Sequence, residues 1–189
     1  MEKKADSRRV KMTKKLLKAS LIELMKETPL HSITIKDICD GADVNRSTFY
    51  RHYETQFDLY DDIISDISDD IEVILTREYG GTHDICLFLT KVLEYIEKNR
   101  DTFLVVLSDK GSLGVGETFN RITGKFLPAE STTELGAYIA QFIAAGMTST
   151  LWTWLNKPVR RSAKEVARLI YVFMRHGLRG AVDFTSRSN

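Results

Sequence analysis

The sequence of 189 residues is poor in the residues that interrupt or cross-link a chain. Its three prolines and eleven glycines are too few for the closely spaced turns of a β-sandwich, and this shortage favours long helices. Its two cysteines cannot build a disulfide framework. No apolar run approaches the roughly 18 residues of a membrane span, and the charged N-terminus lacks the apolar core of a signal peptide. Because 43% of the residues are apolar, we expect a cytoplasmic, mostly helical protein with a buried core and no membrane contact.

The net charge of +1 conceals a segregation of charge along the chain. Residues 1–55 hold twelve basic and eight acidic residues, whereas residues 56–75 hold seven acidic residues and no basic one. The first eighteen residues are the most basic stretch, with eight lysines and arginines against two acids. A basic end on a nearly neutral protein indicates an anionic partner at that end, and the alternative is a solvated, frayed terminus.

Apolar spacing and capping residues predict helices throughout and no strand. The predicted helices cover residues 7–28, 35–42, 46–53, 55–79, 82–98, 100–107, 117–127, 131–156 and 162–175, about nine in all. Thr34, Asn45, Thr55 and Ser162 are the expected N-caps, and Gly177 is the expected stop signal of the last helix. In the helix after Thr55 the expected inward positions are Phe57, Tyr60, Ile64, Ile67, Ile71 and Ile74.

The first three helices, the last two of them joined by a tight turn, form a helix-turn-helix pattern. This part contains Thr34, then Asp37 and Ile38, a turn at residues 42–44, and the run Tyr50, Arg51, His52, Tyr53. These residues resemble the DNA-binding domain of TetR-family transcriptional regulators, and the resemblance covers residues 8–55. It implies an all-α fold with a helix-turn-helix domain in residues 1–54 and a C-terminal helical bundle in residues 55–189, where the family senses effectors and dimerises.

A recognition helix reads the major groove through donors near its N-terminus, and residues 46–48 occupy that place. Arg46 can pair with a guanine edge, and Thr48 can bond a base or contact a thymine methyl group. Tyr50 and His52 resemble the family's phosphate contacts, although His52 could instead pack at the helix junction and Arg51 could be only a solvated charge. Phe49 and Tyr53 are expected in the core. The candidate DNA-binding residues are Thr34, Lys36, Asn45, Arg46, Ser47, Thr48, Tyr50, Arg51 and His52.

Three further expectations concern the DNA-binding region. The basic residues of the first eighteen are expected to form a mobile arm, and the acidic segment 56–75 a solvated helix face away from DNA. The family usually has glycine in the turn, where this chain has Asp43, a residue that tolerates the left-handed conformation. The family also commonly has a lysine at the start of the fourth helix, where this chain has Gln56. The loss of that phosphate contact predicts weaker or less salt-dependent binding.

The resemblance implies a homodimer through the last two long helices, 131–156 and 162–176, bound to a near-palindromic operator. The dimer-interface candidates are small residues at four-residue spacing, which could instead pack within the subunit: Gly136, Ala140, Ala144 and Thr148. The effector-pocket candidates are aromatic, and ordinary core is their alternative role: Tyr95, Phe103, Phe119, Tyr138, Phe142 and Trp152. Residues 145–155 also resemble the subgroup that includes regulators of dihydroxyacetone kinase operons, some of which act with a partner protein.

The expected function is therefore a dimeric, sequence-specific regulator, a repressor that a small-molecule effector releases from DNA. The alternative is an adaptor whose C-terminal domain docks a partner protein. No serine elbow, phosphate-binding loop or zinc-protease motif is present, so we expect no catalysis. We expect no cofactor or metal either, because His83 and Cys86 alone make a weak metal site.

Overall fold

The computed structural model describes residues 2–79, 84–108, 134–158 and 160–187, and all of its regular elements are helical. The predicted helix over residues 117–127 and the residue Thr82 lie outside the described part. The α-helices are α1 (Glu2–Met25), α2 (Ile35–Ala42), α3 (Arg46–Tyr50), α4 (Gln56–Ile74), α6 (Ile85–Lys98), α7 (Arg100–Val106), α9 (Glu134–Asn156) and α10 (Ala163–Arg187). A 3-10 turn, η1 (Leu30–Ser32), precedes α2, and a π-helical turn, η2 (Leu75–Tyr79), follows α4.

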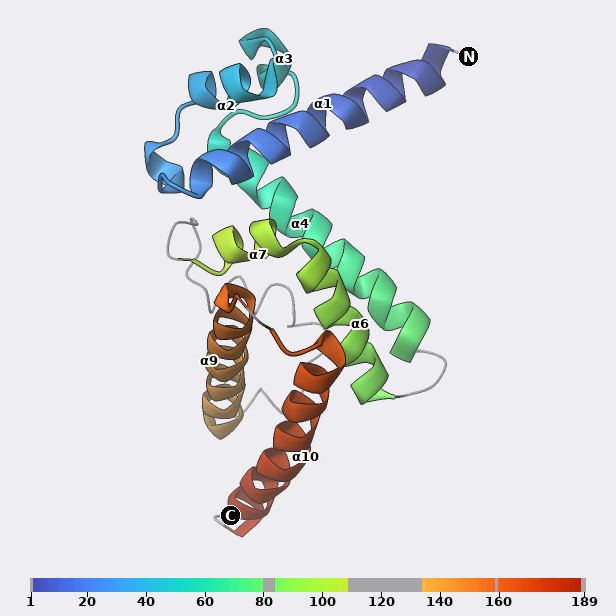
Figure 1. The fold of residues 1–189 in the computed structure, drawn as a ribbon, viewed down its shortest axis with the longest axis vertical. Coiled ribbons are helices and arrows are strands. Elements are labelled where there is room, and N and C mark those ends of the chain that lie inside the picture. Colours follow the sequence, from blue (N-terminus) through green and yellow to red (C-terminus); the bar gives the residue numbers. More distant parts are fainter. Residues whose placement is uncertain (1, 80–83, 109–133, 159, 188–189) are drawn as a thin grey trace.

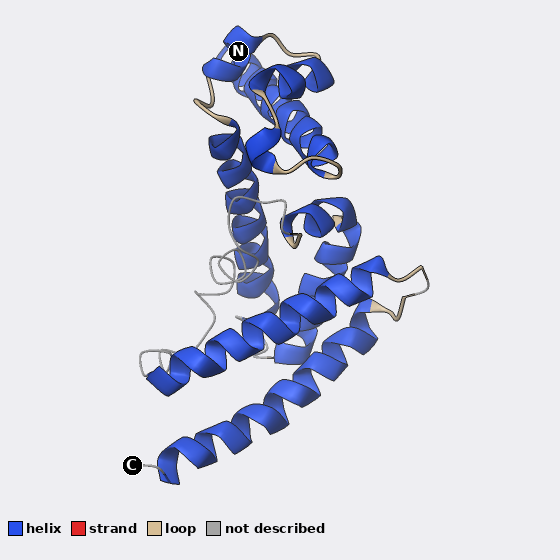
Figure 2. Ribbon diagram, turned by 90° about the vertical axis from the view of Figure 1, so that its left-hand side faces the viewer, coloured by secondary structure: helices blue, strands red, loops and turns tan. Residues whose placement is uncertain are grey.

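The helices are arranged in two groups that α4 connects (Figure 1). α1, α2 and α3 gather at one end of the molecule, and α9 and α10 lie at the other end. α9 and α10 lie side by side and run in opposite directions (Figures 1 and 2). Within the described residues, no helix is both long enough and apolar enough to cross a bilayer. The all-helical architecture predicted from the sequence is thus confirmed for this part of the chain.

Local capping sets where several helices begin, as predicted. Thr34 and Thr55 each form a capping box with the aspartate three residues on, Asp37 and Asp58. Asn45 accepts a hydrogen bond from the Ser47 backbone amide at the start of α3. Ser162 and Glu165 exchange the same kind of bonds before α10.

Other helix boundaries differ from the prediction. α1 begins at Glu2 and is helical through the basic segment, so the predicted arm is part of a helix. α3 ends at Tyr50 rather than residue 53, and Asp84 caps α6 through the Leu87 amide. α10 passes through Gly177 to Arg187, so Gly177 is no stop signal. A helical glycine costs only about 1 kcal/mol relative to alanine, and the rest of a long helix offsets that cost.

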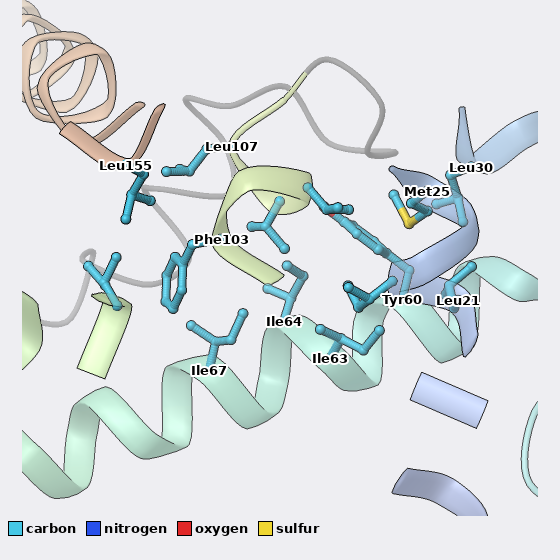
Figure 3. Close-up of a cluster of buried hydrophobic side chains, with 14 of the residues drawn as sticks. Leu21, Met25, Leu30, Tyr60, Ile63, Ile64, Ile67, Phe103, Leu107 and Leu155 are labelled. Atoms are coloured by element: carbon cyan, nitrogen blue, oxygen red, sulfur yellow. The ribbon is translucent and has the colours of Figure 1, made fainter. Parts of the chain in front are cut away.

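One continuous core joins the two groups of helices (Figure 3). Tyr60 and Ile64 of α4 are fully buried, next to Met25 of α1 on one side and Phe103 of α7 on the other. The inward face of α4 differs from the prediction at its start, because Phe57 is exposed while Leu59 and Ile63 are buried. α4 carries apolar residues on two adjacent stripes, and packing against α1 selects the stripe with Leu59.

α1 and α2 approach closely at a glycine. A Cβ atom added to Gly41 would lie 2.5 Å from the Ser20 side-chain oxygen. Ser20 Oγ is buried and donates a hydrogen bond of 2.8 Å to the Ile38 carbonyl, so it cannot easily move away. Gly41 therefore permits the packing that holds α2 on α1.

Candidate nucleic-acid interface

The turn between α2 and α3 has the sharp geometry of a helix-turn-helix motif. Asp43 adopts a left-handed conformation, with φ 52° and ψ 45°. The Val44 amide then donates to the Cys39 carbonyl at 3.0 Å, which closes the end of α2. The turn therefore needs the conformation for which glycine is usual, and aspartate is among the side chains that tolerate it.

α3 is fixed on its inner side and open on its outer side. Phe49 is fully buried and its ring packs on Tyr53, whose ring centroid lies 5.6 Å away, so both are in the core as expected. Arg46 and Ser47 are exposed at the start of the helix, Thr48 is half-buried, and Tyr50 is 59% exposed. The arrangement presents polar side chains at a helix N-terminus, which is the geometry that major-groove reading requires.

Arg51 and His52 lie in the turn after α3 rather than within the helix. Arg51 is exposed, whereas His52 is half-buried with its ring centroid 6.3 Å from that of Tyr53. The Asn45 side chain accepts from the Ser47 amide and hydroxyl, both at 3.1 Å, so its oxygen already serves as the cap. Of Arg51 and His52, Arg51 has the side chain more open to an external partner.

The start of α2 contributes one exposed cation, Lys36, and one N-cap, Thr34. The Thr34 hydroxyl donates to Asp37 at 2.6 Å, and this bond together with the Thr34 amide lowers the pKa of the Asp37 carboxyl. Lys36 is exposed and lies 3.8 Å from Asp40, a loose surface pair of little energy. Thr34 therefore positions α2, while Lys36 remains available to a phosphate.

The basic residues of α1 divide into two sets. Arg8, Arg9, Lys11 and Lys15 are exposed, as a cationic surface requires. Lys14 and Lys18 instead turn toward α4, where both lie near Asp62, at 3.2 Å and 3.0 Å. The expectation that all these side chains belong to a mobile arm is wrong for Lys14 and Lys18.

Asp62 is the centre of a polar cluster that joins α1, α4 and the end of the helix-turn-helix motif. The Tyr53 hydroxyl donates to its carboxylate at 2.5 Å, and Lys14 Nζ also lies 5.1 Å from the centre of the Tyr53 ring. Burial alone would raise the pKa of Asp62, but the bonds from Tyr53 and Lys18 and the charge of Lys18 outweigh it and lower the pKa. The expectation of a fully solvated acidic face is therefore wrong at Asp62. Sequence separations of 44 and 48 residues left no local signal for these contacts.

The aromatic pocket candidates that the structure describes lie in different surroundings. Phe103 is buried in the core, and Tyr95 packs edge-to-face on it at 5.8 Å while its hydroxyl donates to Asp70. Tyr138 and Phe142 of α9 are exposed, the latter by 67%. Phe119 lies outside the described residues. Trp152 lines a separate cleft between α1, α7 and α9.

The dimer candidates on α9 face mainly inward. Ala144 and Thr148 are buried within the subunit, and Gly136 is half-buried; the side chain of Ala140 is outside the described part. The outward stripe of α9 is Tyr138, Phe142 and Gly146, two residues further along the helix and hence about 200° around it. A Cβ atom on Gly146 would meet nothing within 4 Å. For Ala144 and Thr148 the structure fits the alternative of packing inside the subunit.

No group of three or more histidine, cysteine or acidic side chains that could hold a metal is found in the part of the chain that the structure describes. His83 of the weak pair with Cys86 is outside that part. Cys39 is buried, and burial raises the pKa of its thiol, as expected for a core residue.

The C-terminal region matches a known family. Residues 85–176 match the model of a transcriptional regulator C-terminal region of TetR type. An uncharacterised helix-turn-helix regulator of Bacillus subtilis, YxbF, is 27% identical over 99 residues, which are 49% of this chain and 26% of that protein. The chain thus matches only about a quarter of the length of this relative.

Solved structures share the fold. A TetR transcriptional regulator from Streptococcus agalactiae superposes with a TM-score of 0.61 and 21% identity, covering 89% of this chain and 97% of that one. A TetR-family protein from Syntrophomonas wolfei superposes with a TM-score of 0.62 and 16% identity, covering 87% of this chain and 94% of that one. The dihydroxyacetone kinase operon activator DhaS superposes with a TM-score of 0.52 and 17% identity, covering 88% of this chain and 96% of that one. The fold is that of these regulators over most of both chains.

Proposed function

Because the chain belongs to the TetR family of transcriptional regulators, we propose that it is a dimeric, non-enzymatic protein that binds double-stranded operator DNA through α3. In this proposal it works in the cytoplasm and represses transcription until a small-molecule effector releases it. The observation that carries the proposal is the outward N-terminus of α3, where Arg46 and Ser47 are exposed while Phe49 anchors the helix.

Contacts to DNA divide by chemistry. Arg46 and Thr48 are the base-reading residues, since they stand at the start of α3 and carry donors for base edges. Lys36, Tyr50 and Arg51 contact phosphates, which sets the register of the protein on the duplex without reading sequence. The exposed basic residues of α1 add affinity that falls as salt rises.

The dimer forms through the outward stripes of α9 and α10. Exposed apolar residues lie on both helices: Tyr138, Phe142, Leu169, Val172 and Phe173. Large exposed apolar side chains on neighbouring helices favour an interaction site, and Gly146 would let a second helix approach closely. A two-fold dimer presents two copies of α3, which must lie about 34–36 Å apart to enter successive major grooves.

Release follows from a change in that separation. The shared core and the Asp62 cluster tie α1 and the recognition motif to α4, so α4 cannot shift without moving α3. An effector that prefers the arrangement with the wrong separation lowers the fraction of protein able to bind DNA.

The second candidate is an adaptor whose C-terminal domain docks another protein. The exposed apolar stripes of α9 and α10 favour it, because the same surface would suit a helical partner of different sequence. A purified chain that is monomeric at micromolar concentration would support the adaptor.

The test of DNA binding is selection of duplexes from a random library at low and moderate salt. Recovery of a near-palindrome with half-sites one turn apart is the expected result. Recovery of only salt-sensitive, sequence-independent DNA would contradict the proposal and leave the adaptor.

A further inference from the structure

A cleft of about 370 Å³ lies between α1, α7 and the end of α9, and its lining includes none of the proposed DNA contacts and none of the proposed dimer contacts. Its volume is within the range of small-molecule sites. Its walls include Met25, Lys26, Arg100, Asp101, Leu104 and Trp152. The cleft lies where the DNA-binding end of the molecule meets the C-terminal bundle, because Lys26 directly follows α1 and Arg100 begins α7.

One wall of the cleft is apolar. Met25 is fully buried below it, Leu104 is half-buried, and Trp152 is 39% exposed. A partly exposed indole beside aliphatic side chains offers a flat surface to a hydrocarbon or aromatic group. These side chains therefore favour a ligand with an apolar part.

The other wall carries two cations and one carboxylate. Arg100 Nε donates to the Leu155 carbonyl at 2.9 Å, which fixes the plane of the guanidinium, and Nη1 lies 3.7 Å from Asp101. Lys26 Nζ lies 2.9 Å from the same aspartate. The hydrogen bond from Lys26 lowers the pKa of the Asp101 carboxyl. Glu23, 2.7 Å from Lys26 Nζ, lies outside the lining and offsets the charge of Lys26. The Arg100 guanidinium is therefore the main group of this wall that suits an anion.

We propose that this cleft binds a small amphipathic carboxylate, with its carboxylate on Arg100 and Lys26 and its apolar part on Trp152 and Leu104. A planar guanidinium held by its Nε binds carboxylates in a defined orientation. The inference rests on the proposed function, since it names the chemical class of the effector and where the effector acts.

Binding at this place acts on the junction between the two groups of helices. The Lys26–Asp101 ion pair connects the end of α1 to α7. A ligand carboxylate competes with Asp101 for Lys26, so an occupied cleft loosens that connection. The ligand therefore favours a different position of α1 from the one that binds DNA. Because the two binding events are linked, bound DNA weakens ligand binding by the same factor as the ligand weakens DNA binding.

The site is tested by fluorine NMR on the full chain labelled with 5-fluorotryptophan, because the sequence has only two tryptophans. Trp152 lines the cleft, whereas Trp154 is buried with its indole N–H donating to the Arg161 carbonyl. The probes are 4-phenylbutyrate and the neutral 4-phenylbutanol. The expected result is a saturable shift of the Trp152 signal alone, with an affinity about tenfold higher for the carboxylate. Equal affinities, or no saturable shift up to about 10 mM, would overturn the proposal.

Two variants locate the binding. Arg100→Gln should weaken phenylbutyrate about tenfold and leave phenylbutanol unchanged, because only the ionic contact is lost. Leu104→Trp should weaken both probes by filling the cleft. Arg77→Gln, at an exposed arginine of η2, is the matched control and should change neither affinity. If Arg100→Gln and Leu104→Trp unfold, as circular dichroism would show, the comparison of the two probes on the unmodified chain decides alone.

The regulatory step has its own measurement. Saturating phenylbutyrate should lower the affinity for the selected operator at least fivefold. An unchanged operator affinity would overturn the effector role of the cleft. Failure to bind any DNA specifically would instead defeat the proposed function, and the fluorine signals would still decide whether the carboxylate site exists.

Discussion

The surfaces of α2–α3 and of α9–α10 are both left open by the fold, but their chemistry is opposite. The first exposes Lys36, Arg46 and Arg51, and its aliphatic residues are buried or half-buried. The second exposes Phe142 and Phe173 on helices whose opposite sides are also apolar. Each surface is therefore informative about a partner, a polyanion for the first and an apolar surface for the second.

The largest expected effect comes from a charge on the apolar surface. Phe173→Asp should convert the dimer into a monomer, because an aspartate cannot be buried without a partner. Operator affinity should fall more than about 100-fold, since each monomer binds a single half-site without avidity. Sedimentation velocity and operator titration measure the two effects.

The control for Phe173→Asp is Val73→Asp, a charge at an exposed apolar residue of α4 outside this surface. It should leave both the dimer and the operator affinity unchanged. A Phe173→Asp variant that remains dimeric would show that α10 is not in the interface.

The next effect is on the polar surface. Arg46→Ala should cost about 1–3 kcal/mol of operator binding and relax the preference at one base position in each half-site. Tyr50→Phe, which removes a phosphate contact, should weaken all sequences about equally. Binding to a set of single-base operator variants distinguishes the two patterns. A uniform loss for Arg46→Ala would exclude its base-reading role.

The two surfaces differ in how far the sequence predicts them. The α2–α3 unit depends on short-range chemistry, since the caps Thr34 and Asn45 and the left-handed Asp43 act within a few residues. All three were predicted, and so were the buried positions of Phe49 and Tyr53.

α9 was harder, because it is apolar all round and its periodicity does not select an inner face. The row with Ala144 was therefore predicted in a dimer interface, with packing inside the subunit as the alternative, and Ala144 and Thr148 are buried. Phe142 was predicted in a pocket, with ordinary core as the alternative, and it is exposed. The contacts of Asp62 with α1 and the convergence of Lys26 with Asp101 depend on tertiary packing, which leaves no local pattern.

The connection between the two surfaces is tested at Asp62. Asp62→Asn should lower the free energy of unfolding by about 1–2 kcal/mol at pH 7, because the ionic contacts with Lys14 and Lys18 are lost in a half-buried site. Asp69→Asn, at an exposed carboxylate of the same helix, is the control and should change it by less than about 0.5 kcal/mol. Urea unfolding provides the measurement.

The pH dependence of that difference has a defined sign. The folded protein lowers the pKa of Asp62 from its ordinary value of 3.8, so the carboxylate stabilises the fold above that pH. This contribution is lost as the pH falls through the lowered pKa. The two proteins should therefore converge in stability in acid, and a difference that stays constant down to pH 3 would show that ionisation of Asp62 is not its source.

The smallest effect is at the turn that directs α3 outward. Asp43→Gly should raise the free energy of unfolding by about 0.5 kcal/mol, because glycine adopts φ 52° without steric cost. The gain is small because glycine also loses more conformational entropy on folding. Asp43→Ala should lower it by about 1 kcal/mol, since alanine has the Cβ atom without the polar group that eases this conformation. In urea unfolding, the stability of the three proteins should decrease in the order glycine, aspartate, alanine at position 43. If alanine were as stable as glycine, the left-handed turn would not limit this motif, and α3 would owe its outward position to Phe49 packing alone.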